Sequence, residues 1–335
     1  MSNKKFIVWG SKLDTGHTHA FVHHAIYRAA ISMGLDAYWL DNRDIVDPSF
    51  FDDSLIVTEQ WLCFENPWSN KIPLRKSSTY IVHYLGTKPP SEENQNNPGF
   101  SMYQDKVKRV IDFRFASNWG IDGVPDKSYA YKFEPEKYNK ISKASYFDKG
   151  ADYDYFYSIW GTDILPDEID MEARFTPYRE PKYAFFGGTI GEWNMGEFEP
   201  FMRACKDNDV EFRHHCPWKN GGLSIEKIRD LVVNSYMAYD ARPANHLANG
   251  YVPCRTIKNI SYGKLGMTNS KAVHDYFDGD VAYSADPYEL FEVTKQMEAR
   301  PDIKDIILRQ MNNVRDNHTY VSRVYDMLQA WEMSL

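Results

Sequence analysis

Hydrophobic and polar positions alternate in short blocks along the first half of the chain. An apolar run at 5–10 is followed by a polar loop and by a helical pattern from about Thr18 to Met33, which Gly34 ends. The next apolar run covers 36–41, and this order of strand, loop, helix and strand is typical of a parallel sheet. Further strands are predicted at 54–59, 78–85, 109–114 and 154–160.

A second alternating series follows residues 161–182, a segment that contains three prolines and mixed charges. Segments of this composition commonly join domains. The pattern after it predicts strands at 182–188, 210–216, 236–242, 265–269 and 280–284. Helices are predicted between these strands and beyond them, at 197–208, 224–235, 255–263, 270–277, 286–298, 302–314 and 317–333.

Two successive series of this kind predict two Rossmann-like domains and an α/β fold class. We expect an N-terminal Rossmann-like domain over residues 1–170 and a C-terminal one over 178–315. A last helix within 316–335 can pack back on the N-terminal domain. Ligands of open parallel sheets bind beyond the carboxyl ends of the strands, so we expect the two domains to face a shared cleft.

The composition narrows the classes of partner and compartment. Of 335 residues, 43% are hydrophobic, which is enough for a packed core and argues against disorder. The formal charge of −8 makes nucleic acid an unlikely partner, since backbone binding depends on many Lys and Arg contacts. The sequence has no apolar stretch near 20 residues and no secretory signal, and its four cysteines lie far apart. We therefore expect a cytoplasmic protein without a membrane span.

The segment 251–270 carries the strongest chemical signal in the chain. Arg255, Lys258 and Asn259 are expected on one face of the first turns of a helix, whose amino end favours an anion. The alternative is a surface helix with solvated basic residues. The next strand runs into polar groups that suit a diphosphate and its ribose: Thr268, Asn269 and Ser270.

The run R-T-I-K-N-I-S-Y-G-K-L-G-M-T-N-S at 255–270 resembles the donor-binding segment of GT-B glycosyltransferases, in the style of the CgeB-like and group 1-like families. The order of elements resembles these families over about 182–300. The resemblance implies a nucleotide diphosphate sugar held by the C-terminal half, with Arg255 on its phosphate. Lys258 stands where many relatives have a ribose-binding Glu, so the ribose contact can shift to Asn259, or Lys258 can add a phosphate contact.

Two further groups of residues are candidates for donor binding. Gly187, Gly188 and Thr189 follow a predicted strand, and glycines there let backbone amides approach phosphate, although a simple tight turn is the alternative. The spacing G-G-x-x-G departs from the dinucleotide pattern G-x-G-x-x-G. GT-B families have a similar glycine-rich turn that faces the donor. Arg242 and His246 precede the donor segment and are candidate contacts to phosphate or sugar.

The loop between the first strand and the first helix offers candidates for a catalytic base. Asp14, His17 and His19 lie beyond the carboxyl end of that strand. Transfer of a sugar to a hydroxyl requires a base, and His or Asp near neutral pKa can serve. We expect His17 to be the base, with Asp14 as the second candidate. GT-B inverting enzymes often place their base in this loop.

No metal or other cofactor is expected. Asp152 and Asp154 form a D-x-D, the metal motif of GT-A transferases, but they precede a strand instead of following one. His214, His215 and Cys216 are adjacent on a strand, so their side chains alternate between its faces. The predicted function is therefore a metal-independent glycosyltransferase that moves a sugar from a nucleotide diphosphate sugar to a hydroxyl of a glycan or other acceptor, with a base that favours inversion. The alternatives are a two-lobed, non-catalytic sugar- or nucleotide-binding protein and a Rossmann-type NAD-dependent oxidoreductase or epimerase.

Overall fold

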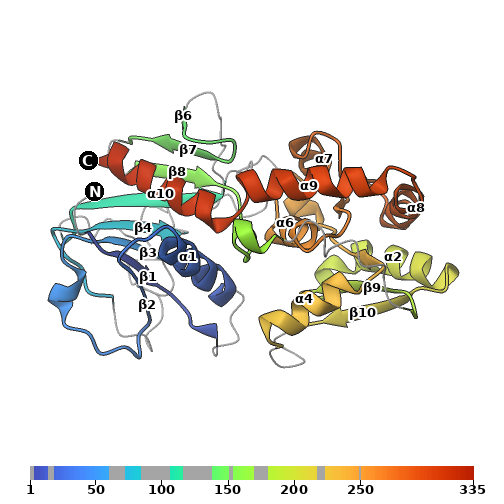
Figure 1. Cartoon of the computed structure of the whole chain (residues 1–335), viewed down its shortest axis with the longest axis horizontal. Helices are drawn as coiled ribbons and strands as arrows, with labels where there is room; N and C mark the ends of the chain where they lie inside the picture. Colours follow the sequence, from blue (N-terminus) through green and yellow to red (C-terminus); the bar gives the residue numbers. More distant parts are fainter. Residues whose placement is uncertain are drawn as a thin grey trace, which may run out of the picture. The chain divides into compact units, whose positions relative to one another are not determined.

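The computed structural model divides into two compact units (Figure 1). Unit 1 comprises Met1–Ile159 together with Tyr320–Leu335, and unit 2 comprises Trp160–Thr319. This boundary precedes the residue 170 expected from the proline-containing segment, because Trp160 already bonds within unit 2, from Nε1 to the Tyr251 hydroxyl at 2.5 Å. The structure describes residues 4–13, 19–59, 72–83, 106–115, 138–150, 154–169, 180–216, 223–248 and 250–335.

Within the described residues, unit 1 is built on an eight-stranded sheet in the order β2-β1-β3-β4-β5-β8-β7-β6. The first six strands of this order run parallel, as the sequence predicts. They are β2 (Ala37–Leu40), β1 (Phe6–Trp9), β3 (Leu55–Glu59), β4 (Thr79–His83), β5 (Arg109–Phe115) and β8 (Asp154–Ser158).

The antiparallel edge of this sheet was not predicted. It consists of β7 (Ser145–Asp148) and β6 (Asn139–Lys140). β6 has two exposed polar residues and β7 only four residues, so neither carries a hydrophobic period long enough to recognise.

Two helices from opposite ends of the chain pack against this sheet and against each other (Figure 1). They are α1 (Ala20–Ser32) and α10 (Tyr320–Ser334). In α10, Arg323 is buried and donates from Nε to the Ile159 carbonyl at 2.8 Å. Asp326 of the same helix accepts hydrogen bonds from Ser142 at 2.8 Å and Ser145 at 2.5 Å. Polar contacts as well as apolar packing therefore fix the last helix to unit 1.

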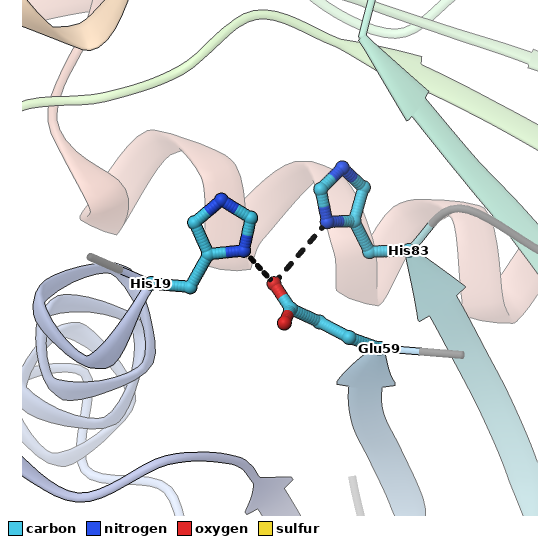
Figure 2. Close-up of side chains that lie close together, drawn as sticks. All are labelled: His19, Glu59 and His83. Carbon is cyan, nitrogen blue, oxygen red and sulfur yellow. Dashed lines mark hydrogen bonds and ion pairs between the residues drawn. The ribbon is translucent and has the colours of Figure 1, made fainter. Parts of the chain in front are cut away.

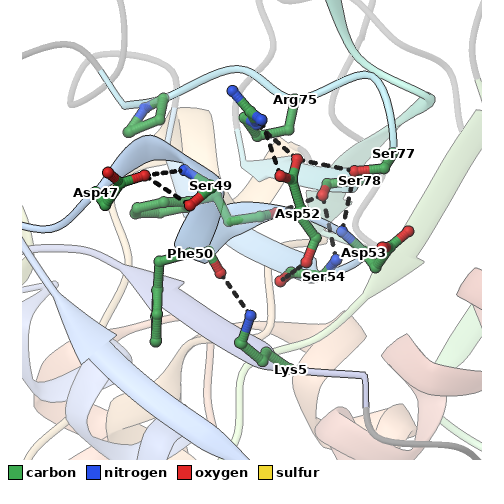
Figure 3. A network of polar contacts seen from close by, with 12 residues as sticks. Lys5, Asp47, Ser49, Phe50, Asp52, Asp53, Ser54, Arg75, Ser77 and Ser78 are labelled. Carbon is green, nitrogen blue, oxygen red and sulfur yellow. Dashed lines mark hydrogen bonds and ion pairs between the residues drawn. The ribbon is translucent and has the colours of Figure 1, made fainter.

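A polar network fixes the amino ends of the central strands of unit 1 (Figure 3). The short 3-10 helix η2 (Pro48–Phe51) precedes it, and Lys5 donates to the Phe50 carbonyl at 2.9 Å. Asp52 receives two hydrogen bonds from Arg75, at 2.6 and 2.8 Å. Because one end of the strands is fixed, their register determines which side chains meet at the carboxyl end. One face of the strands contributes to a core cluster of Ile7, Trp9, Phe51, Ile56, Ile72, Tyr80, Val82, Val107 and Val110.

Unit 2 contains two short parallel sheets surrounded by helices. In the first, β9 (Tyr183–Gly187) lies between β10 (Glu211–His215) and β11 (Met237–Ala238), and in the second β12 (Met267–Thr268) pairs with β13 (Ala282–Tyr283). Among the helices that the structure describes, none is long and apolar enough to cross a lipid bilayer. The remaining elements of unit 2 are η9 (Pro166–Glu168), η11 (Glu192–Asn194), α2 (Met195–Asp207), α4 (Ile225–Val233), α5 (Ala244–Ala248), α6 (Cys254–Ser261), α7 (Lys271–Tyr276), α8 (Pro287–Glu298) and α9 (Ile303–Asn317).

Local sequence accounts for where several of these helices begin. Ser224, Ser270 and Asp286 each accept a hydrogen bond from a backbone amide of the helix that follows and are therefore its N-cap. Beside β9, the rings of Phe201 and Tyr239 stack at 3.7 Å. This aromatic packing holds the strand ends that carry the candidate site of unit 2.

Candidate functional site

Arg255 lies in the first turn of α6 and is fixed by contacts to the end of β9. Its Nε donates to the Gly187 carbonyl at 2.9 Å, and its guanidinium lies over the Phe186 ring at 4.2 Å. α6 begins after Pro253, and among the described residues no side chain caps this end of the helix. The amides and dipole at the amino end of α6 therefore add to the positive charge of Arg255.

Asp240 joins Arg255 to a second arginine. Its carboxylate is fully buried, and it accepts from Arg255 Nη1 at 2.9 Å, from Thr256 at 2.5 Å and from Arg242. Two guanidiniums thus share one carboxylate, and the group of Arg242, Asp240 and Arg255 (the arginine pair) has a net positive charge. Burial and the charge of Arg242 lower the pKa of Arg255, and Asp240 opposes this. An arriving anion would offset the repulsion between the two cations.

A buried hydrogen-bond donor in the arginine pair also favours the binding of an anion at this site. Arg242 Nε is buried, and within the described part of the chain nothing accepts a hydrogen bond from it. A buried donor without a partner costs free energy, and a ligand oxygen would remove that cost.

The Gly187–Gly188 turn is shaped around Arg255. Gly188 has φ 152°, and a Cβ at this position would lie 2.5 Å from Arg255 Nη2. A side chain here would displace the guanidinium. The turn continues into Thr189, whose carbonyl accepts from Asn194 at 3.0 Å. Glycine at this position is therefore explained by the close approach of the arginine.

Other predicted donor residues engage in bonds within the fold. Lys258 lies 3.4 Å from Asp163, whereas Arg255 contacts Asp240 and Gly187. Asn259 donates to the Ala238 carbonyl at 3.0 Å. The three polar residues at the end of β12 and just after it are buried and form hydrogen bonds within the fold: Asn269 with the backbone of Arg242, Thr268 with the Ser270 amide, and Ser270 with the start of α7.

His246 lies in α5, close to the arginine pair. Its ring centroid is 4.8 Å from that of Tyr251. Burial and the nearby charge of Arg242 lower the pKa of His246 to about 4. The side chain is thus neutral near pH 7 and adds no charge to the site.

In unit 1, the ends of two neighbouring strands and the start of α1 bring His19, Glu59 and His83 together (Figure 2). Glu59 ends β3, His83 ends β4, and the two residues are paired in register. His19 immediately precedes α1. Glu59 Oε1 contacts His19 Nδ1 and lies 3.3 Å from His83 Nδ1. The other predicted base candidates, Asp14 and His17, lie outside the described residues.

The charge of Glu59 depends on the imidazoles around it. Burial disfavours its carboxylate, but His23, His19 and His83 together hold the pKa of Glu59 well below its ordinary value. Burial lowers the pKa of His83 to about 4, so this ring is neutral near pH 7. His23 Nε2 approaches the same oxygen of Glu59, at 3.5 Å.

His19 has the geometry of an oriented base. Its side chain is 25% exposed, whereas that of Glu59 is 3% exposed. Its Nδ1 faces the carboxylate, and Figure 2 shows Nε2 directed away from it. A carboxylate that accepts from Nδ1–H favours the tautomer in which Nε2 carries the lone pair. Glu59 and His83 were not identified as site residues from the sequence. Their position, as a charged residue and a histidine at the ends of apolar strands, is a sequence feature that could have indicated a site.

The other possible metal motifs have structural explanations. Asp154 accepts two hydrogen bonds from Arg109, at 2.9 and 2.8 Å, and Asp152 lies outside the described residues. His214 is exposed and His215 buried, as alternation along β10 requires.

No family model and no curated protein sequence matches the chain. Solved structures do. One is an alpha-glucosyltransferase in complex with UDP and a 13-mer DNA containing a HMU base, with 9% identity, coverage of 99% of this chain and 100% of that one, and a TM-score of 0.54. The chain has a GT-B fold. A second alpha-glucosyltransferase complex, with UDP-glucose and DNA containing an abasic site, gives 8% identity, full coverage of both chains and a TM-score of 0.52.

The GT-B fold is also that of AviGT4, a glycosyltransferase involved in Avilamycin A biosynthesis, which is 10% identical over 98% of this chain and 97% of that one, with a TM-score of 0.50. These similarities confirm the predicted α/β fold class and the resemblance to GT-B proteins. They give no support to the expectation that nucleic acid is an unlikely partner, because two of the three structures contain DNA.

The ion pair of Lys258 with Asp163 is expected to make the stability of the fold depend on pH. Burial disfavours the Asp163 carboxylate, but Lys258 and the Tyr262 hydroxyl, which donates at 2.5 Å, hold the pKa of Asp163 below its ordinary value. A lowered pKa stabilises the fold above the unfolded-state value of about 3.9, and this stabilisation is lost as the pH falls through the folded value. We expect Asp163→Asn to lower the free energy of unfolding by about 1.5–3 kcal/mol at pH 7.

Urea unfolding at pH 7 and at about pH 3 measures this difference. The difference between the two proteins should shrink at the lower pH, because the unfolded wild-type chain then binds a proton at this carboxyl while the lowered pKa of Asp163 disfavours protonation in the fold. Asp280→Asn is the matched control, since Asp280 pairs with Arg309 at the surface and should contribute less. An equal loss of unfolding free energy at both pH values would contradict a stabilising ion pair between Asp163 and Lys258.

Proposed function

We propose that this chain is a glycosyltransferase that moves a sugar from a nucleotide diphosphate sugar to an acceptor hydroxyl. The observation that carries the proposal is the arginine pair, anchored by buried Asp240 beside the amino end of α6. This group lies at the carboxyl end of β9, where ligands of parallel α/β sheets bind. The GT-B fold, found in enzymes of this class, is consistent with it.

The donor diphosphate is the anion that suits the arginine pair. Guanidinium groups bind phosphate oxygens through paired N–H groups, and the amides of α6 can add further donors. In this proposal the leaving diphosphate is stabilised by Arg255 and Arg242 without a divalent cation. UDP-sugars are the first donors to test, since UDP and UDP-glucose are bound in the alpha-glucosyltransferase structures.

His19 is proposed as the base among the described residues. The acceptor oxygen forms a bond to the anomeric carbon while the bond from that carbon to the diphosphate breaks, and the hydroxyl proton passes to His19 Nε2. Glu59 holds the ring in the tautomer that this transfer needs. A direct displacement of this kind inverts the anomeric configuration. His17 and Asp14 remain proposed members of the same loop.

Ligand binding separates this proposal from the two alternatives. A thermal-shift panel of UDP-, GDP-, dTDP- and CMP-sugars, with NAD as a comparison, should show stabilisation by a nucleotide sugar that persists in EDTA. Stabilisation by NAD alone would favour an oxidoreductase or epimerase. Binding of a nucleotide sugar without turnover on any acceptor would favour a two-lobed binding protein.

Arg255→Ala should weaken donor binding because it removes one of the two guanidiniums. We expect a loss of at least tenfold in UDP affinity, of the size of a charged hydrogen bond, about 1.5–3 kcal/mol. Isothermal titration measures it. Arg309→Ala is the control, an arginine that pairs with Asp280 at the surface of unit 2 and should leave the affinity unchanged. Wild-type affinity in Arg255→Ala would remove the basis of the proposal.

His19→Ala should leave donor binding intact and reduce turnover. Loss of a general base typically costs about 10²–10⁴-fold in rate. The measurement pairs a UDP-release assay with UDP titration, so that a folding defect, which would change both readouts, is recognised. Turnover within about twofold of wild type would show that another group, such as His17, takes the proton.

A further inference from the structure

Two histidine nitrogens and one carboxylate oxygen converge in unit 1 with the spacing of metal ligands. His19 Nδ1, Glu59 Oε1 and His83 Nδ1 all lie within 4.8 Å of one another (Figure 2). They come from three separate elements, and Glu59 and His83 are buried. A side-chain set of two imidazoles and one carboxylate is a common three-ligand set for zinc.

One of the separations within this cluster matches that between two ligands of a tetrahedral ion. Zinc bonds of about 2.0–2.2 Å put neighbouring ligand atoms roughly 3.4 Å apart. His83 Nδ1 is 3.3 Å from Glu59 Oε1, which matches this edge length. His19 is nearer to the carboxylate, in a hydrogen bond, and would have to move outward. Its side chain is 25% exposed, and the residue precedes the first turn of α1.

The charge and chemistry of the cluster also suit a cation. Glu59 is a buried carboxylate, and within the described residues nothing donates to its Oε2. Imidazole nitrogens favour zinc and its neighbours in the first transition row, whereas magnesium and calcium prefer oxygen ligands alone.

We propose that His19, Glu59 and His83 form a binding site for a divalent transition metal of the zinc class. Three protein ligands leave a fourth position for water, on the exposed side where His19 meets solvent. The site is separate in role from the arginine pair, which in the proposed function balances the donor diphosphate without a metal. Metal binding here is thus an additional property of unit 1.

The metal and the proposed base would compete for one imidazole, a consequence that rests on the proposed function. A neutral ring that binds metal through Nδ1 carries its proton on Nε2. Nε2 is then unable to accept the proton of the acceptor hydroxyl. Occupation of the site therefore inhibits transfer and leaves donor binding in unit 2 unchanged.

The test is a Co²⁺ titration of the full chain after chelator treatment, followed by visible ligand-field absorption. We expect one Co²⁺ per chain, displaced by Zn²⁺. Glu59→Gln and His83→Asn should each weaken binding by at least about tenfold. His274→Asn, which changes a part-buried histidine of α7, should bind Co²⁺ like wild type. UDP binding and far-UV circular dichroism establish that each variant is folded.

Absence of Co²⁺ and Zn²⁺ binding in the wild type would overturn the proposal, as would unchanged binding in folded Glu59→Gln and His83→Asn. If the wild type binds metal, Zn²⁺ should inhibit UDP release from the donor without changing UDP affinity. Activation by Zn²⁺ would contradict the proposed competition between the metal and the acceptor proton for His19. If no donor is turned over, the proposed function fails, and the Co²⁺ titration still decides the metal site by itself.

Discussion

A carboxylate buried at the carboxyl end of a parallel sheet needs compensating partners, and this requirement shapes both candidate sites. Asp240 of unit 2 and Glu59 of unit 1 are almost completely buried. Removing such a charge from water costs several kcal/mol unless hydrogen bonds and opposite charges replace the solvent. Asp240 is compensated by guanidiniums and Glu59 by imidazoles. The choice of partner gives the site in unit 2 a net positive charge and surrounds the carboxylate in unit 1 with imidazoles.

The arginine pair shows how a structural need can prepare a binding site. Asp240 neutralises one of two guanidiniums, so the remaining charge is held in place before any ligand arrives. Gly188 admits the Arg255 side chain, and Phe186 supports its flat face. Side chains fixed in this way lose little conformational freedom on binding, which favours affinity for a diphosphate.

Much of the fold could be predicted from the sequence, because hydrophobic periods and caps are local signals. The parallel strands of unit 1, the helix at Arg255 and the glycine turn before it all followed from short segments. The residues of the candidate sites could be predicted only where they lie together in one short segment of the sequence. Glu59 and His83 are 24 residues apart and meet through strand register, and Asp240 is positioned by β11. Helical spacing predicts that Lys258 lies near Arg255, but it gives no sign of the ion pair with Asp163, which is distant in sequence.

A comparison of UDP with uridine tests whether unit 2 recognises phosphate through the arginine pair. Isothermal titration of both ligands into the wild-type chain should show UDP binding at least about 100-fold more tightly, because uridine lacks the diphosphate that the guanidiniums would hold. Equal affinities for the two ligands, or no binding of UDP or any other nucleoside diphosphate, would contradict the account.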